Sequence, residues 1–106
     1  MIEIKYYQDK NEISIKGHAN SDEIGHDLVC ASVSALFYTL VENAKHYEEL
    51  KYGKIAKISI KSGNVRFKFN ALESRKKTVI FGFNTLCVGF ELLAENFPQN
   101  ILYKIL

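Results

Sequence analysis

The 106-residue chain has no long uninterrupted apolar segment and no marked excess of charge of either sign. Its 14 basic and 12 acidic side chains give a formal net charge of +2, which offers no electrostatic argument for tight nucleic-acid binding. The most continuous apolar stretch, residues 28–41, includes Cys30, Ser32 and Ser34 and is too short and too polar to span a bilayer. We therefore expect no membrane association and no direct contact with nucleic acid.

We also expect no secretion signal, because charged residues interrupt the opening segment Met-Ile-Glu-Ile-Lys. Cysteine is scarce, and two cysteines without a signal peptide indicate free thiols in a reducing cytoplasm rather than a disulfide. The chain has no linker, repeat or low-complexity tract, and a second hydrophobic core would have too few residues. We expect one domain over residues 1–106, in the cytoplasm.

Hydrophobic periodicity divides the chain into seven elements. Alternation of apolar and polar residues predicts strands over 1–7, 12–18, 54–61, 64–70 and 100–106. Helical patterns run from 27 to about 50 and from 74 or 78 to 97, where Pro98 ends the second helix. The expected order is ββαββαβ.

Both predicted helices are apolar on nearly every face, the first through residues 28–41 and the second through residues 79–97. Such helices have to be covered on more than one side. The most economical arrangement is an α+β fold with the two helices sandwiched between two small antiparallel sheets. The alternative is a two-layer fold whose outer helical face is buried by dimerisation.

The segment from residue 17 to residue 34 carries the reactive side chains. His18 lies at a strand exit, and Cys30 lies in the first turn of the helix that Asp27 is expected to cap. As the third helical residue, Cys30 would meet unpaired N–H groups and the positive helix end, which lower a thiol pKa from about 8.5 by one or more units. Its thiolate could then attack a carbonyl while His18 protonates the leaving amine, with the same N–H groups as oxyanion donors.

Each of these residues also has a plainer interpretation. A cysteine on an apolar helix is more often a packing residue, and Cys87 in the second helix is interpreted that way. Asp27 could act only as a helix cap or could also orient His18 or grip substrate. Ser34 shares a helix face with Cys30 and could bond near the sulfur or back to a carbonyl one turn earlier. Residues 19–26 are expected to form a mobile cover hinged at Gly25.

The full constellation resembles the signature of a known family. Gly17-His18-Ala19, Gly25, Asp27 and the run from Val29 to Leu36 are similar to the signature of the ribosomal-processing cysteine protease family, Prp. That signature reads Gly-His-Ala, a loop, then Gly-x-Asp-hydrophobic-Val-Cys-Ala-Ala-Val-Ser. Ser32 replaces the usual second alanine, and the resemblance extends over essentially the whole chain.

The resemblance implies a cysteine protease with a Cys/His dyad, in which Cys30 is the nucleophile and His18 the base. Gly17, Asp27 and Ser34 would support the dyad or contact substrate. Members of this family remove a short N-terminal extension from a bacterial large-subunit ribosomal protein, cutting after a hydrophobic, aromatic-containing segment. The resemblance further implies a homodimer, and we expect no cofactor.

Two other functions stay open. His26 and Cys30 are four residues apart, so with His18 and either Asp22 or Glu23 they could hold a metal ion. A non-catalytic, ribosome-associated dimeric binding module would keep the fold while leaving Cys30 inert. The dyad is the favoured interpretation, and it needs no metal.

Overall fold

The computed structural model describes residues 1–18 and 26–106, without the side chains of His26 and Asp27. Along the chain the elements are β1 (Ile2–Tyr7), η1 (Gln8–Lys10), β2 (Glu12–Lys16), α1 (His26–Glu49), β3 (Gly53–Lys61), β4 (Asn64–Ala71), η2 (Glu73–Arg75), α2 (Lys76–Asn96) and β5 (Ile101–Ile105). The predicted order of five strands and two helices is confirmed, with boundaries within a few residues of those expected.

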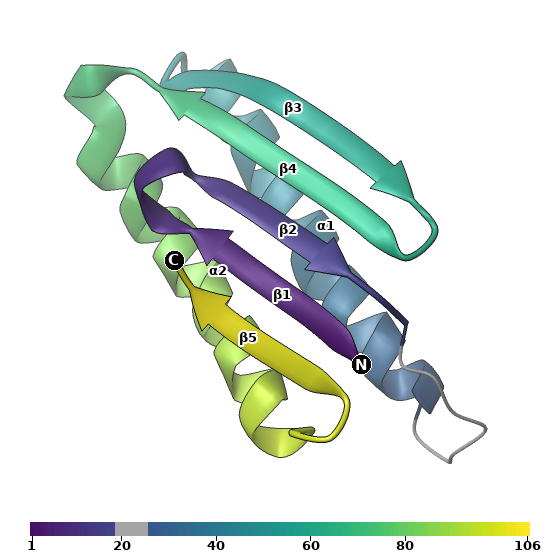
Figure 1. Cartoon of the computed structure of the whole chain (residues 1–106). Coiled ribbons are helices and arrows are strands. Elements are labelled where there is room, and N and C mark those ends of the chain that lie inside the picture. The colour runs from purple at the N-terminus through teal and green to yellow at the C-terminus, as the bar shows by residue number, and fades with distance from the viewer. Residues whose placement is uncertain (19–25) are drawn as a thin grey trace.

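The strands form one mixed sheet in the order β3-β4-β2-β1-β5, in which β5 runs parallel to β1 and the other neighbours are antiparallel. Both helices lie on one face of this sheet (Figure 1). The α+β class is therefore confirmed, whereas the expected arrangement of helices between two antiparallel sheets is wrong. The β1–β2 hairpin and the β3–β4 hairpin lie side by side because β2 pairs with β4. The backbone groups on these two strand edges therefore bond to each other and are not left as exposed edges.

The core lies between the sheet and the helices. Alternate strand residues point toward the helices, and each helix turns one face toward the sheet. The buried apolar residues are Ile2, Ile4, Tyr6, Ile13, Ile15, Phe67, Phe69 and Ile101 from the sheet, with Val29, Val33, Phe37, Leu40, Val41, Ala44, Val79, Phe83, Cys87 and Phe90 from the helices. Within residues 1–18 and 26–106, no further layer covers the opposite face of the sheet or the outer faces of the helices.

The outer helix faces keep large apolar side chains exposed. On α2 these are Phe81, which is 74% exposed, Val88 and Leu92, and on α1 they include Leu28. By length and composition alone, the segment Glu73–Asn96 is also apolar enough to cross a membrane, although one face of it packs into the core. The helices are therefore apolar on nearly every face because one face packs on the sheet and the opposite face carries these exposed apolar side chains.

Candidate active site

The backbone around His18 is fixed from two sides. After β2 ends, Gly17 adopts a φ of +99°, a left-handed conformation that favours glycine, and a Cβ there would collide with the Met1 carbonyl oxygen. The Gly17 N–H donates to the Gly63 carbonyl at 2.9 Å, and the Met1 amino group donates to the His18 carbonyl at 2.8 Å. These contacts hold the strand exit against β1 and against the β3–β4 turn.

The imidazole of His18 packs on Gly63, which has a φ of +71° in the β3–β4 turn. A Cβ built at position 63 would overlap Nε2 of His18 and lie 3.1 Å from Cδ2 and Cε1. The missing side chain at Gly63 therefore provides the space that the ring occupies. The sequence pattern predicted a strand on each side of this turn, and no spacing linked Gly63 to His18.

Cys30 is the fifth residue of α1, because the helix begins at His26. The expectation that Asp27 caps the helix and that Cys30 is its third residue is therefore wrong. The N–H of Cys30 is positioned to pair with the carbonyl of residue 26, so the unpaired N–H groups belong to earlier residues. Helical side chains lean toward the N-terminus, which directs the Cys30 side chain back toward that first turn.

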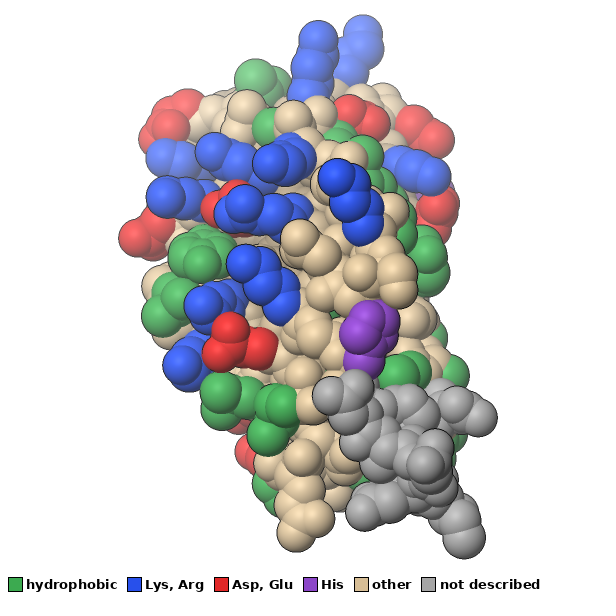
Figure 2. Space-filling view, turned by 45° about the vertical axis from the view of Figure 1, so that its right-hand side comes forward, with side chains coloured by type: hydrophobic (Ala, Val, Ile, Leu, Met, Phe, Trp, Pro, Cys, Tyr) green, Lys and Arg blue, Asp and Glu red, His purple; other side chains and the backbone are tan. Residues whose placement is uncertain are grey.

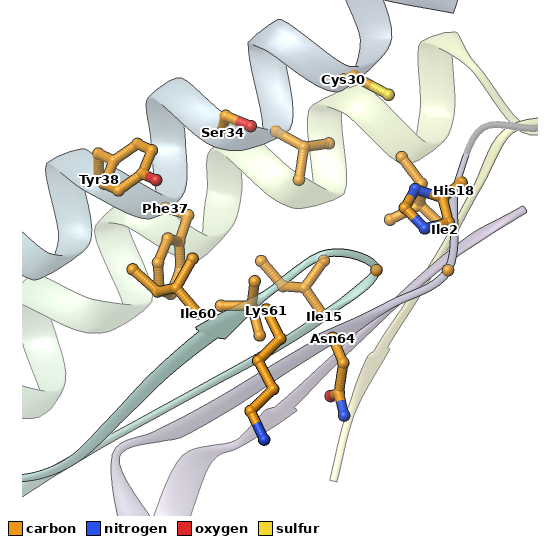
Figure 3. A pocket seen from close by; sticks show the side chains of 14 residues that line it. Ile2, Ile15, His18, Cys30, Ser34, Phe37, Tyr38, Ile60, Lys61 and Asn64 are labelled. Atoms are coloured by element: carbon orange, nitrogen blue, oxygen red, sulfur yellow. The ribbon is translucent and has the colours of Figure 1, made fainter.

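Cys30 and His18 line the same pocket, which has a volume of about 260 Å³. In Figure 3 the Cys30 sulfur points from α1 toward the side of the pocket on which His18 lies. Gly17 lines the pocket as well, and so does Ser34, one turn further along α1, as expected from helical spacing. The pocket thus brings together four of the five predicted site residues.

The rest of the pocket is mostly apolar. Phe37 and Tyr38 of α1 face Ile60 of β3 across it (Figure 3), with Ile15 and Val65 from the central strands also in the lining. Sequence reasoning missed these residues as pocket lining because it placed them only in a predicted helix and in predicted strands. A usable signal was present, since residues 30, 34, 37 and 38 recur at the spacing of one helix face.

Several expectations fall outside the described residues. They are the cover formed by residues 19–26 with its hinge at Gly25, the role of the Asp27 carboxylate, and the metal ligands Asp22, Glu23 and His26. Among the residues that the structure describes, no group of three His, Cys, Asp or Glu side chains could hold a metal ion.

The two serines after Cys30 differ in their contacts. The Ser32 hydroxyl donates to the Leu28 carbonyl one turn earlier at 2.7 Å, outside the pocket. Within the described part of the chain the Ser34 hydroxyl has no hydrogen bond, so it does not bond back to its own helix. Ser34 thus presents an available hydroxyl to the pocket.

The two cysteines lie in contrasting environments. Cys30 is partly exposed, whereas Cys87 is buried in the core, and both are free thiols. Burial raises the pKa of the Cys87 thiol from 9.0 to about 12, so this thiol is neutral at physiological pH. A buried neutral thiol is a poor nucleophile, as expected for a packing residue.

Comparison with solved structures identifies the fold. The essential ribosomal processing protease Prp from S. aureus in complex with a substrate peptide is 19% identical, with a TM-score of 0.70 over 99% of this chain and 97% of that chain. The same protease with a covalently linked product peptide gives 21% identity and a TM-score of 0.68, with the same coverage. SMU.848 from Streptococcus mutans is 26% identical, with a TM-score of 0.69 over 99% of this chain and 91% of that chain. A comparison with curated proteins found no match.

The fold is that of the solved Prp protease structures. The family model described as cysteine protease Prp matches residues 1–102, so the chain belongs to the Prp cysteine protease family. The resemblance found in the sequence is thereby confirmed.

Proposed function

We propose that this protease is an endopeptidase that uses Cys30 as nucleophile and His18 as general acid and base. The observation that carries the proposal is that the two side chains, on a strand exit and on a helix, line one pocket. A nucleophile needs solvent access and a proton-transfer partner. Cys30 is partly exposed and lines the same pocket as His18, whereas Cys87 lies in the core.

The proposed reaction has two stages. The Cys30 thiolate attacks the carbonyl carbon of the scissile peptide bond, and the protonated His18 imidazole gives its proton to the leaving amine as the C–N bond breaks. A water molecule, deprotonated by His18, then attacks the thioester and releases the acid and the Cys30 thiolate. The N–H groups of the first turn of α1 are candidates for holding the oxyanion.

The proposed substrate is the N-terminal extension of a bacterial large-subunit ribosomal protein. The apolar part of the pocket, with Phe37, Tyr38 and Ile60, suits a large apolar or aromatic side chain next to the scissile bond. The structural neighbour from S. aureus is a ribosomal processing protease and was crystallised with a substrate peptide. We propose that this chain acts as one domain, in the cytoplasm, and without a cofactor.

Three further residues are proposed to support the dyad. Gly17 sets the backbone conformation that directs His18, because a side chain there would collide with Met1. Ser34 lies one helical turn from Cys30 with an available hydroxyl, and it is a candidate for contacting the substrate backbone. Asp27 is retained as a supporting residue on the basis of the family signature.

We also propose that the protein is a homodimer formed through its helix layer. The exposed stripe of Phe81, Val88 and Leu92 on α2, with Leu28 on α1, provides an apolar surface that a second copy could bury. Burial of this stripe in a dimer would contribute a favourable free energy of about 25 cal/mol for each Å² of apolar surface removed from water.

The direct test is to incubate the purified protein with a peptide that spans the extension of the host's ribosomal protein and to weigh the products. Cleavage at a single bond, lost in Cys30→Ala and in His18→Ala but kept in Cys87→Ala, supports the proposal. Iodoacetamide labelling near pH 6 separates it from a non-catalytic binding module. The proposal requires Cys30 to react well before Cys87 and a model thiol, whereas equal sluggishness at both cysteines favours the module.

A further inference from the structure

The open face of the sheet is strongly basic. Strand residues alternate between the two faces, and the side chains that alternate with the buried positions point away from the helices. The basic residues on this face are Lys5, Lys16, Lys54, Lys57, Lys61, Lys68, Lys104 and Arg66. Figure 2 shows lysine and arginine side chains gathered on one side of the molecule. We call these eight side chains the basic sheet face.

Acidic side chains are few on this face. Glu3 forms an ion pair with Lys5 at 3.4 Å, and Glu12 forms one with Arg66 at 3.8 Å. Within the described ranges 1–18 and 26–106, the other six cations of the face make no salt bridge. The near-neutral composition therefore conceals a segregated charge distribution, in which most acidic residues lie outside this face.

Two cation pairs stand directly opposite each other across strands. Lys57 of β3 pairs in register with Lys68 of β4, and Lys5 of β1 pairs with Lys104 of β5. Like charges at directly opposed positions destabilise a sheet. Their presence at two places on one face indicates a surface shaped by an anionic partner rather than by stability.

Protection of the sheet edges accounts for only part of this pattern. Lysines on edge strands prevent edge-to-edge aggregation, which explains those on β3 and β5. The cations on the three inner strands, Lys5, Lys16, Arg66 and Lys68, have no such role because their backbones are already paired on both sides. The inner cations therefore call for another explanation.

We propose that the basic sheet face binds the phosphate backbone of RNA. The cations are spread over five strands spaced about 4.8 Å apart, and alternate residues along a strand are about 6.7 Å apart, which gives a dense array of charge. Nucleic-acid interfaces are polar and positively charged, whereas the centres of protein interfaces are apolar and depleted of charge. Among the described residues of this face, Leu102 is the large apolar side chain that is exposed. The face therefore has no apolar centre of the kind that a protein partner would bury.

The face adjoins the active-site pocket through Lys61, which lines the pocket while its amine extends away from α1 in Figure 3. RNA bound there would hold the pocket close to proteins assembled on the same RNA. That this RNA is ribosomal rests on the proposed function, but the binding of RNA by the face does not.

The test uses fluorescence anisotropy with a labelled single-stranded RNA of about 20 nucleotides. Lys57→Glu with Lys68→Glu reverses charge on the face away from the pocket, and Lys45→Glu with Lys77→Glu makes the same charge change on the helix layer. We expect the first double variant to bind at least tenfold more weakly and the second to stay within about twofold of the wild type. If all six cations without a salt bridge contact phosphates, log K should fall against log salt with a slope of about −4 in the wild type. The slope should be about −3 in the face variant.

Equal weakening of RNA binding in both double variants, or no RNA binding at low salt, would overturn the inference. Displacement of RNA by polyglutamate at the same charge concentration would also overturn it, because it would indicate an acidic polypeptide as the partner. Cleavage of a free peptide is measured in parallel and should be unchanged in the face variant. Loss of RNA binding with intact cleavage separates this inference from the dyad, and absence of cleavage in the wild type would count against the proposed function alone.

Discussion

The substitution Gly63→Ala tests whether the β3–β4 turn positions the imidazole of His18 for the proposed reaction. A methyl group at position 63 would overlap Nε2 of His18, and ordinary contact begins near 3.4 Å, so the ring would have to move by about 1 Å. A misplacement of that size costs about 100-fold in rate when it affects a reacting group. We therefore expect kcat/KM for the extension peptide to fall by about two orders of magnitude.

The same substitution has a separate cost in stability. Position 63 has a φ of +71°, and a residue with a Cβ loses roughly 1–2 kcal/mol in the left-handed region. A domain stable by about 5–15 kcal/mol stays folded after such a loss. Urea unfolding should therefore show a modest shift that does not account for the loss of cleavage.

Two variants separate the ring from the backbone. Asn tolerates the left-handed conformation, so Gly63→Asn should recover part of the stability while its Cβ still displaces His18 and keeps kcat/KM low. Ser62→Ala changes the same exposed turn without placing an atom against the ring and should leave cleavage within about twofold. Recovery of activity together with stability in Gly63→Asn would refute the positioning role and leave only backbone strain.

Four other outcomes follow from the structure. Cys30→Ala and His18→Ala should each abolish cleavage while the urea midpoint changes little, because both side chains line an open pocket and Cys30, which packs against the edge of the core, is only partly buried. A loss of several kcal/mol in Cys30→Ala would contradict this. In the native protein near neutral pH, thiol alkylation followed by peptide mass analysis should modify Cys30, with Cys87 reacting only after denaturation. Burial raises the pKa of the Cys87 thiol from 9.0 to about 12, so the stability contributed by the protonated thiol is present below pH 9 and is lost as pH rises toward 12. The free energy of unfolding should fall by about 1.4 kcal/mol per pH unit over this range for this one proton. Urea titrations of Cys87→Ala should show a shallower decline. Phe81→Glu should shift the light-scattering mass to that of a monomer at a concentration where the wild type is a dimer, and an unchanged mass would exclude this face as the interface.

The sequence predicted the elements well because each of them carries a strong local signal. Strict alternation marked the strands. Pro98 placed the end of the second helix at residue 97, which is one residue beyond the observed end at Asn96 and is the observed cap. The start of α1 was less well defined, since Asp27 is a good cap by residue type but the helix begins at His26. Because of this earlier start, Cys30 is the fifth helical residue instead of the expected third, and the N–H groups left without a helical partner are those of the residues before it.

The arrangement of the sheet could not be predicted in the same way. Joining β2 to β4 depends on pairing between segments about fifty residues apart, as in Ile15 with Val65, and no local pattern encodes that register. The all-round apolar helices were interpreted as needing cover on two sides, and the sheet covers one of these sides. Periodicity cannot distinguish a second sheet from a second subunit as that cover, because both bury the same side chains.

The pocket and the basic sheet face show two ways in which a fold brings scattered residues together. Gly63 makes room for His18 across forty-five residues of sequence, and only the paired turn brings the two together. The lysines of the sheet are each unremarkable in the sequence, but a period of two directs them all away from the helices. The net charge of a chain does not depend on this period, so a nearly neutral chain can still have one strongly basic surface. The charge of each sheet face therefore has to be determined from the alternation of residues along each strand.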